Sequence, residues 1–334
     1  MKIEFNSDIE KFITDSAKNI IDFAGDTYFK YTPEKEKFLL NKYRSQGLNL
    51  DTLKIDSSLI LDNPYFKNIS LKPIDKYNNF EYSLVKQPKN MFMNVAWMLP
   101  GVNKSLDDFV KLGYYTKDMY LPVLKQGSNV WMSPSLAEQT TIDPYAKKAF
   151  GHVLTFGLGI GYFVYMASIN DKVTEITVVE KDSGVIEMFK EFILPQFNTS
   201  LKINIIQSDI FDVFNNEFLD KFDSIFVDVW MSNEDGLNIL EKLLTQCNYK
   251  GNIDYWVEFS CYYSVRTLMM VYFKALIDKN LSDVICNMDG ENKGIFKKIH
   301  RYFRNTDLTV ISSNVLKNYM YDNSVIREIL SIDI

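Results

Sequence analysis

A short stretch near the middle of the chain combines an apolar run with three alternating glycines. The run Val153–Phe156 is followed by Gly157, Gly159 and Gly161. A short apolar run bounded by glycine is typical of a strand that is buried on both faces. Glycine has no Cβ, so the backbone can turn tightly and approach a ligand closely. A helix that begins after the turn presents free N–H groups and its positive end. The stretch therefore predicts a cofactor-binding loop.

Acidic residues end the next three predicted strands of the same region. They are Glu180, Asp209 and Asp228. Ligands of an open parallel sheet bind beyond the carboxyl ends of the strands, at the switch in strand order. Glu180 lies 19 residues after Gly161, and an acid at about 20 residues commonly accepts hydrogen bonds from ribose hydroxyls. The carboxylate of Asp209 is suited to accept a hydrogen bond from the exocyclic amine of adenine. The four strand ends together predict a nucleoside site.

The spacing of the glycines bears on which nucleoside is bound. A dinucleotide turn, G-x-G-x-x-G, needs glycine at the position of Tyr162. Here the third glycine is Gly161, and the stretch contains no P-loop pattern. An NAD-dependent enzyme is therefore the outside alternative.

These residues must be positioned by alternating strands and helices. From Gly151 onward, five predicted strands alternate with helices, which predicts right-handed crossovers and a mostly parallel sheet. The predicted strands are Val153–Phe156, Glu175–Val179, Lys202–Ile206, Ser224–Val227 and Tyr255–Phe259. Leu308–Ile311 is expected to pair antiparallel at the sheet edge. The fold class expected for residues 126–334 is α/β, a Rossmann-like doubly wound sheet.

Residues 1–125 are expected to form a separate N-terminal α+β domain or cap. Amphipathic spacing predicts a helix over residues 7–24, and Pro33 begins a second helix that ends at Ser45. Phe80–Val85 and Met91–Trp97 are predicted to form a hairpin. Asp143-Pro144 is expected to start the helix that precedes the glycine stretch.

Composition limits the partners and the compartment. The chain has 334 residues, a formal charge of −6 and 46% hydrophobic residues. An acidic balance argues against a nucleic-acid partner. No apolar run approaches the ~18 residues of a membrane span, and acids in the first residues argue against a signal peptide. Three scattered cysteines favour a reducing, cytoplasmic location and, with two isolated histidines, predict no metal site. A homodimer is expected only because homodimers are common among soluble proteins.

Four segments resemble the class I S-adenosylmethionine-dependent methyltransferase superfamily, and are most similar to its spermidine-synthase-like branch. They are Val153–Tyr162, Ile176–Ile186, Ser208–Phe211 and Phe222–Asp228. The resemblance covers about residues 127–260 and implies S-adenosylmethionine as cofactor. The residues that it implies in cofactor binding are Gly157, Leu158, Gly159, Gly161, Glu180, Lys181, Asp209, Ile210, Asp228 and Glu138. Trp131 and Ser133 are expected beside Glu138 in the upstream segment of the site.

The chain also departs from patterns of this superfamily. Aminopropyl-transferring members carry a second aspartate three residues after the acid that ends the fourth strand, and here that position is Met231. Glu234 or Asp235 would have to take the place of that missing aspartate, at a different spacing from the fourth strand. An Asn/Asp-Pro-Pro-Tyr pattern is absent as well. Methyl transfer to a small-molecule acceptor is thus favoured. Aminopropyl or aminocarboxypropyl transfer, and a non-catalytic nucleoside-binding protein, are the alternatives.

Methyl transfer from a sulfonium is an in-line displacement that requires alignment, exclusion of water and sometimes a base. Asp228 and Glu258 are the candidate catalytic residues because both are predicted at or near strand ends. A capping or solvent-exposed role is the alternative for Glu258. Aromatic residues that could line the pocket, or simply pack in the core, are Tyr162, Trp230, Tyr262 and Tyr263.

Overall fold

The centre of the molecule is a five-stranded parallel sheet with the order β11-β10-β9-β12-β13. The computed structural model describes residues 4–22, 29–72, 76–77, 79–247, 249–288, 290–306 and 310–334. The strands of this sheet are β9 (Gly151–Phe156), β10 (Val173–Glu180), β11 (Lys202–Gln207), β12 (Ser224–Val227) and β13 (Ile253–Tyr255). The predicted α/β, Rossmann-like fold class is confirmed by this sheet.

The order of the strands reverses beside β9. Chain order leads outward from β9 to β10 and β11, and then returns to β12, which pairs with the other side of β9. The carboxyl ends of β9 and β12 therefore meet at the switch point, where ligands of such sheets bind. The helices that connect or precede these strands are α5 (Leu136–Lys148), α6 (Tyr162–Ser168), α7 (Ser183–Met188), α8 (Ile210–Val213), α9 (Asn216–Leu219) and α10 (Asn233–Gln246).

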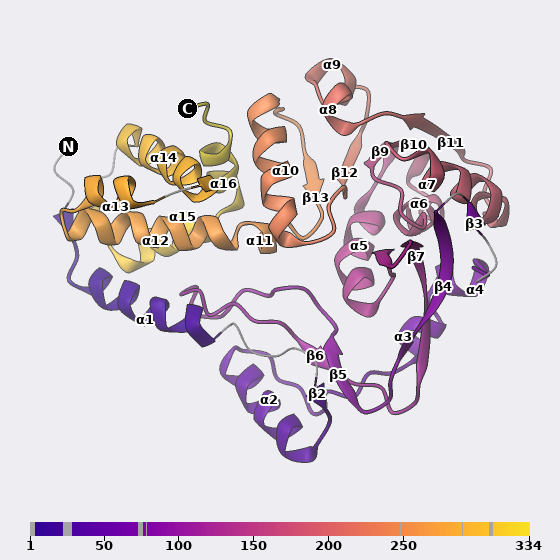
Figure 1. Ribbon diagram of the computed structural model, residues 1–334, viewed down its shortest axis with the longest axis horizontal. Helices are drawn as coiled ribbons and strands as arrows, with labels where there is room; N and C mark the ends of the chain where they lie inside the picture. Colours follow the sequence, from indigo (N-terminus) through magenta and orange to yellow (C-terminus); the bar gives the residue numbers. More distant parts are fainter. Residues whose placement is uncertain are drawn as a thin grey trace.

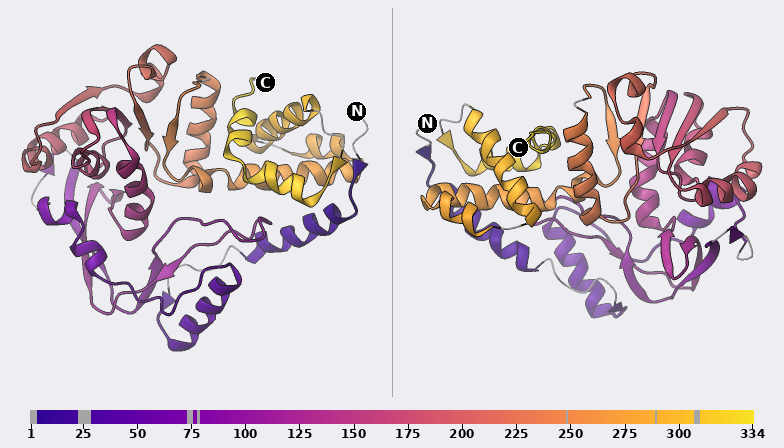
Figure 2. Two further views of the ribbon diagram at one scale, coloured as in Figure 1. Left: turned by 180° about the vertical axis from the view of Figure 1, so that it is seen from behind. Right: turned by 45° about the horizontal axis from the view of Figure 1, so that its top comes forward.

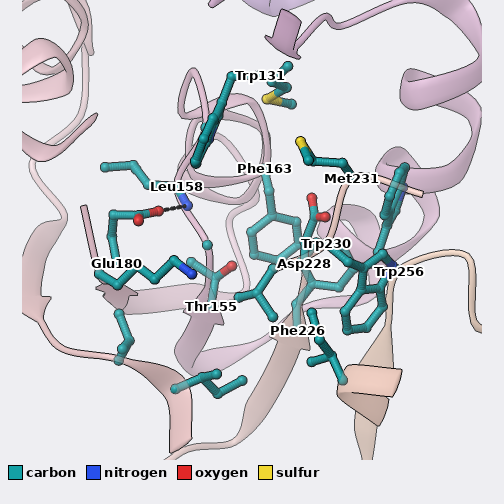
Figure 3. Close-up of a pocket in the computed structure, with 18 of the residues that line it drawn as sticks. Trp131, Thr155, Leu158, Phe163, Glu180, Phe226, Asp228, Trp230, Met231 and Trp256 are labelled. Carbon is teal, nitrogen blue, oxygen red and sulfur yellow. Dashed lines mark hydrogen bonds between the residues drawn. The ribbon is translucent and has the colours of Figure 1, made fainter. Parts of the chain in front are cut away.

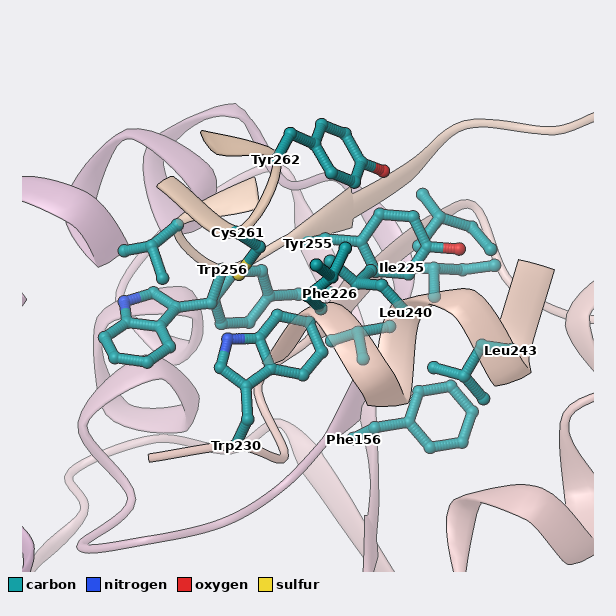
Figure 4. Packing of buried hydrophobic residues seen from close by; sticks show 14 of the residues in the cluster. Phe156, Ile225, Phe226, Trp230, Leu240, Leu243, Tyr255, Trp256, Cys261 and Tyr262 are labelled. Carbon is teal, nitrogen blue, oxygen red and sulfur yellow. The ribbon is translucent and has the colours of Figure 1, made fainter. Parts of the chain in front are cut away.

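Buried aromatic and aliphatic side chains hold β9, β12 and β13 to α10 (Figure 4). Phe156 and Ile225 on the strands pack with Leu240 and Leu243 on α10, and all four are at most 3% exposed. Strands that are apolar along their whole length are required because both faces of a parallel sheet are covered.

Two antiparallel sheets precede the parallel sheet. One has the order β3-β4-β7-β8 and the other β2-β5-β6. The strands and helices of this part are β2 (Phe29–Lys30), α2 (Pro33–Ser45), α3 (Ser58–Leu61), α4 (Pro64–Asn68), β3 (Lys76–Tyr77), β4 (Phe80–Gln87), β5 (Met91–Asn94), β6 (Leu112–Gly113), β7 (Met119–Gln126) and β8 (Asn129–Met132). The predicted hairpin is wrong, because β4 pairs with β7 and β5 pairs with β2 and β6.

Helices from both ends of the chain lie together at one side of the molecule (Figures 1 and 2). They are α1 (Asp8–Asp22), α11 (Glu258–Cys261), α12 (Tyr263–Ile277), α13 (Leu281–Asn287), α14 (Gly290–Asn305), α15 (Ser313–Tyr321) and α16 (Asn323–Leu330). α1 packs against α12 and α15. None of the helices in the described ranges has the length and apolarity needed to cross a bilayer.

The last strand belongs to a different sheet from the one predicted. β14 (Val310–Ile311) pairs parallel with β1 (Glu4–Phe5) instead of antiparallel at the edge of the central sheet. Leu308 and Thr309 of the predicted strand lie outside the described residues, as do the last two residues of the predicted helix 7–24. The local sequence does not identify the partner of so short a strand, because the paired residues are 306 positions apart in the chain.

Contacts cross the predicted boundary at residues 125 and 126, as two examples show. β8 lies beyond that boundary but pairs with β7. Asp108 forms a buried ion pair with Arg266 of α12 at 3.4 Å, and Tyr321 of α15 donates to the same carboxylate. The division into two domains stays a prediction.

Two of the boundaries that differ from those predicted affect the site. α5 begins at Leu136, where Ser135 caps it by accepting from the Glu138 N–H, and Pro144 lies inside this helix. The fifth strand ends at Tyr255, and Glu258 opens the short helix α11.

Candidate functional site

A cavity lies over the carboxyl ends of β9, β10 and β12, at the switch point of the sheet (Figure 3). Nine of the ten residues expected to bind the cofactor line it: Gly157, Leu158, Gly159, Glu180, Lys181, Asp209, Ile210, Asp228 and Glu138. These residues come from four strand ends and one helix, so the sheet topology brings all of them except Glu138 together. Whether each binds a cofactor stays a prediction.

The glycine loop lies against the end of β12. Gly157 has φ +93°, and a Cβ added there would overlap the carbonyl oxygen of Asp228. Only glycine satisfies both that φ and that close approach. Gly161 is the one expected residue that does not line the cavity. It is the N-cap of α6 with φ +69°, and a Cβ there would meet the ring of Phe189. In the structure, Gly161 caps the start of α6 and allows the ring of Phe189 to pack closely against the backbone.

Glu180 holds the glycine loop in place. Its Oε2 accepts from the Leu158 N–H at 3.0 Å, and its Oε1 accepts from the Asp182 N–H at 2.9 Å. Each carboxylate oxygen has a second lone pair, so both can still accept a ribose hydroxyl from the cavity. Burial raises the pKa of Glu180, and these backbone hydrogen bonds act in the opposite direction.

Asp228 and Glu138 form an acidic region on the other side of the cavity. Burial, followed by the nearby charge of Glu180, raises the pKa of Asp228 to about 7. Burial and the charge of Asp228 hold the pKa of Glu138 well above its usual value. Two desolvated carboxyl groups in one cavity would be stabilised by a positively charged ligand. Lys181 is the one basic residue among the described residues that line the cavity.

Asp209 and Ile210 lie beyond the end of β11, beside Glu180. Asp209 caps α8 by accepting from the Phe211 N–H through Oδ1 at 3.0 Å. Ile210 is 6% exposed and contributes an aliphatic surface. This end of the cavity combines a carboxylate with an apolar wall, which suits a planar heterocycle with an exocyclic amine.

Aromatic rings form much of the remaining wall (Figure 3). Phe163 and Phe226 are stacked at 4.4 Å between ring centroids, and Trp131 lies across the cavity mouth from Met231. Of these aromatic residues, sequence reasoning singled out Trp131 and Trp230 and missed Phe163, Phe226 and Trp256. Phe226 could have been found from strand alternation, but nothing local marks Phe163 or Trp256.

Tyr162 does not line the cavity but anchors the helix behind it. Its hydroxyl donates to Asp143 Oδ1 at 2.8 Å and accepts from Asn63 Nδ2 at 2.7 Å. Tyr65 donates to the carbonyl of Ile160 at 2.6 Å. Residues of the N-terminal part thus fix both ends of the short segment Ile160–Tyr162.

Glu258 lies outside the cavity lining, which corrects its predicted position at a strand end. Its Oε1 accepts from Arg327 Nε at 2.5 Å and from the hydroxyl of Tyr262 at 2.7 Å. Its Oε2 accepts from Arg327 Nη2 and from Asn323. The carboxylate is therefore engaged in joining α11 to α16. Tyr262, Tyr263 and Ser133 are also absent from the described lining.

One of the two acids that could substitute for an aspartate at Met231 is already engaged by the backbone. Asp235 accepts from the backbone N–H groups of Met231 and Ser232 and so closes the loop after β12. The side chain of Glu234 lies outside the described part of the chain. Met231 itself is 63% exposed at the cavity mouth.

The chemistry of the residues that line the cavity fits an adenosyl sulfonium. Gly157 and Gly159 leave room for close approach, Glu180 offers lone pairs for hydroxyl groups, and Asp209 offers a carboxylate for an amine. The raised pKa of Asp228 marks a site where a cation would be favourable.

Comparison with protein-family models and with curated proteins gave no match. Among solved structures, spermidine synthase from Thermotoga maritima is similar over 64% of this chain and 84% of its own, at 15% identity and a TM-score of 0.32. PKMT2 from Rickettsia typhi, in complex with AdoHcy, is similar over 59% of this chain and 38% of its own, at 20% identity and a TM-score of 0.23.

A candidate S-adenosylmethionine-dependent methyltransferase from Streptococcus mutans is similar over 44% of this chain, at 15% identity and a TM-score of 0.27. The likeness spans less than half, 43%, of the length of that protein. With the strand order β11-β10-β9-β12-β13 and a glycine loop at the switch point, the chain has a Rossmann-like α/β fold.

Proposed function

We propose that the protein is an S-adenosylmethionine-dependent methyltransferase that acts on a small molecule. The observation that carries the proposal is the convergence of the glycine loop, Glu180, Asp209 and Asp228 on one cavity at the switch point. When bound, the cofactor would supply an electrophilic methyl group on a sulfonium.

The residues of the chain would align the reactants and exclude water. Gly157 and Gly159 would allow close approach of the loop, and Glu180 would accept hydrogen bonds from the ribose. Asp209 and Ile210 would hold the adenine. The rings of Trp131, Phe163 and Trp256 would exclude water from the reacting centre. An aromatic face near a sulfonium adds an attraction of about 0.5–2 kcal/mol.

Asp228 is the candidate base. With a pKa of about 7, it is partly ionised at neutral pH and could accept a proton from the acceptor. Glu258 is excluded from this role in the proposal because its carboxylate is paired with Arg327. Met231 at the cavity mouth offers no second carboxylate for an amine, which favours methyl over aminopropyl transfer.

Ligand binding followed by product analysis tests this function. We expect S-adenosylmethionine and S-adenosylhomocysteine to raise the melting temperature, and NAD to leave it unchanged. Incubation with acceptor mixtures and labelled cofactor should yield S-adenosylhomocysteine. Methylthioadenosine as the product would show aminocarboxypropyl transfer instead, or aminopropyl transfer if decarboxylated S-adenosylmethionine is supplied. Stabilisation by NAD alone would reject the proposed cofactor.

A further inference from the structure

Two acidic side chains of the cofactor cavity have no partner within the part of the chain that the structure describes. They are Asp228, which follows β12, and Glu138 on α5. No hydrogen bond or ion pair of either carboxyl group is found among the described residues. Both residues are half-buried rather than enclosed, and Figure 3 shows the carboxyl group of Asp228 directed into the cavity. Both groups are therefore available to a molecule held there.

The electrostatics of these two groups favour a positively charged partner. Burial and the charge of Asp228 hold the pKa of Glu138 well above its usual value, and burial is also the main reason that the pKa of Asp228 rises to about 7. A cation placed beside them favours their ionised forms and so offsets part of the cost of burial. Lys181, the basic residue of the described lining, follows Glu180 directly and contributes to neither shift.

Aromatic rings line the same cavity as the two carboxyl groups. They include Phe163, Trp230 and Trp256 (Figure 3). The face of an aromatic ring attracts an ammonium group by about 0.5–2 kcal/mol, and a carboxylate forms a charge-assisted hydrogen bond with an N–H donor. Neither indole offers a donor to an anion, because Trp256 Nε1 already donates to Thr141 at 3.0 Å and Trp230 Nε1 is enclosed. The lining thus suits an ammonium group.

The surroundings of the two carboxyl groups provide no further carboxylate for a second positive charge on the acceptor. At the cavity mouth, Trp131 lies across from Met231, and both side chains are uncharged (Figure 3). A second cavity, of about 230 Å³, shares Glu138 with the first. Glu138 is the one carboxyl group in the described lining of that second cavity, where Met93 and Leu121 contribute apolar surface. A molecule with one ammonium group and an apolar remainder fits these surroundings.

We propose that the methyl acceptor is a monoamine, bound as an ammonium ion between Asp228 and Glu138 with its apolar part toward the mouth at Trp131 and Met231. The ammonium gives one proton to the carboxylate of Asp228, and the freed nitrogen lone pair takes the methyl group, so that the N–C bond forms as the S–C bond breaks. The product leaves as a methylated ammonium ion, and Asp228 returns its proton to water. The reaction rests on the proposed function, whereas binding of the amine does not.

Four probes of equal chain length test the ligand class: hexylamine, diaminohexane, hexanol and hexanoate. Each is titrated in a calorimeter into the full chain saturated with S-adenosylhomocysteine, at about pH 8, where Asp228 is mostly ionised and the amines keep their protons. Hexylamine should bind at least about tenfold more tightly than each of the other three. Equal or tighter binding of hexanol, hexanoate or diaminohexane overturns the proposal.

Two variants and a charge-matched control test the two carboxyl groups. D228N and E138Q each remove one negative charge while nearly keeping the shape of the side chain, and melting curves verify that each variant is folded. Each should weaken hexylamine binding about tenfold, which corresponds to about 1.4 kcal/mol. E217Q removes one negative charge from the exposed side of α9, outside the described lining, and should leave the affinity unchanged. Unchanged affinity in D228N or E138Q, or an equal loss in E217Q, overturns the proposal.

Titrations with and without S-adenosylhomocysteine separate this proposal from the proposed function. If S-adenosylhomocysteine displaces hexylamine, the two carboxyl groups hold the ammonium of the nucleoside ligand itself, and the proposal is overturned. If S-adenosylhomocysteine binds but hexylamine binds in neither state, the amine site is wrong and the proposed function stands. If hexylamine binds but no adenosyl ligand does, the proposed function is wrong and the amine site stands.

Discussion

The backbone at Gly157 lies against the carbonyl of Asp228, so closely that a single Cβ on Gly157 would overlap the carbonyl oxygen. Gly157 follows β9 and Asp228 follows β12, the two paired strands at the switch point. This contact fixes the glycine loop relative to Asp228, whose carboxyl group is proposed to act in the reaction, and both residues line the cavity at the switch point.

Replacing Gly157 with alanine should therefore damage both stability and ligand binding. The new Cβ meets backbone, which cannot move aside as a flexible side chain would. We expect G157A to lower the free energy of unfolding by about 3 kcal/mol or more and to abolish binding of S-adenosylhomocysteine in calorimetry. G127A is the matched control, because Gly127 also has positive φ but has no atom within 4 Å of an added Cβ. In that variant the free energy of unfolding should fall by only about 1 kcal/mol. Similar losses in both variants would show that φ, and not the contact, is the constraint.

Glu180 should be required for adenosine recognition and for the shape of the loop. E180Q replaces one accepting oxygen by a donor, so either Leu158 N–H or Asp182 N–H loses its partner. Unfolding experiments should show a loss of about 1–3 kcal/mol, with an adenosine affinity at least tenfold weaker. The matched control is E175Q. Glu175 lies on the same strand as Glu180 but outside the described cavity lining, and its carboxylate pairs with Lys202. The control variant should bind adenosine normally. Equal affinity in wild type and E180Q would remove Glu180 from the proposed site.

The raised pKa of Asp228 predicts a specific pH dependence. In the folded protein the group keeps its proton up to about 7, whereas in the unfolded chain it ionises near 3.8. Between these values the folded state binds more protons, so this group's contribution to stability falls as the pH rises. D228N cannot ionise. It should therefore be more stable than wild type at about pH 8, with the difference shrinking toward about pH 4.

Ligand affinity provides an independent check of the same group. Ionised Asp228 favours a cation, so the preference for S-adenosylmethionine over S-adenosylhomocysteine should increase from about pH 6 to about pH 7.5 in wild type. In D228N this increase should vanish. A pH-independent stability difference between D228N and wild type, measured by denaturant titration, would contradict the raised pKa.

Glu258 should be important for stability and dispensable for cofactor binding. E258Q breaks the bidentate pair with Arg327. Because the Arg327 side chain is partly accessible to solvent, we expect the free energy of unfolding to fall by about 2–4 kcal/mol. The affinity for S-adenosylhomocysteine should stay within about twofold of wild type. K148A breaks the exposed pair with Asp254 and should cost no more than about 1 kcal/mol. A selective loss of turnover in E258Q, with normal stability, would restore a catalytic role for this residue.

The central sheet could be predicted because its signals are local. Apolar runs, the glycine spacing and the acids after each strand follow one another along the chain, and parallel topology then collects them at one edge. Nine of the ten expected cofactor residues line the cavity for this reason. Gly161 does not line the cavity, and its close neighbour, Phe189, comes from another element and leaves no mark beside the glycines.

Other features depend on contacts between distant parts of the chain. The pairing of Glu258 with Arg327, of β1 with β14 and of β4 with β7 each joins segments that carry no matching signal. The end of β13 at Tyr255 moved Glu258 away from the strand end. The segment Tyr255–Phe259 is apolar enough for a strand or a buried helix, and periodicity does not distinguish them at this length.

The sequence by itself therefore determined the sheet, the glycine loop and the carboxylates that follow its strands, because each depends on neighbours a few residues away. The tertiary structure decided which of those groups share a cavity and which are used in packing. It also placed Asn94 and Trp97 in a second cavity beside Glu138. That placement depends on how the N-terminal sheets lie against α5, and no local pattern encodes such a contact.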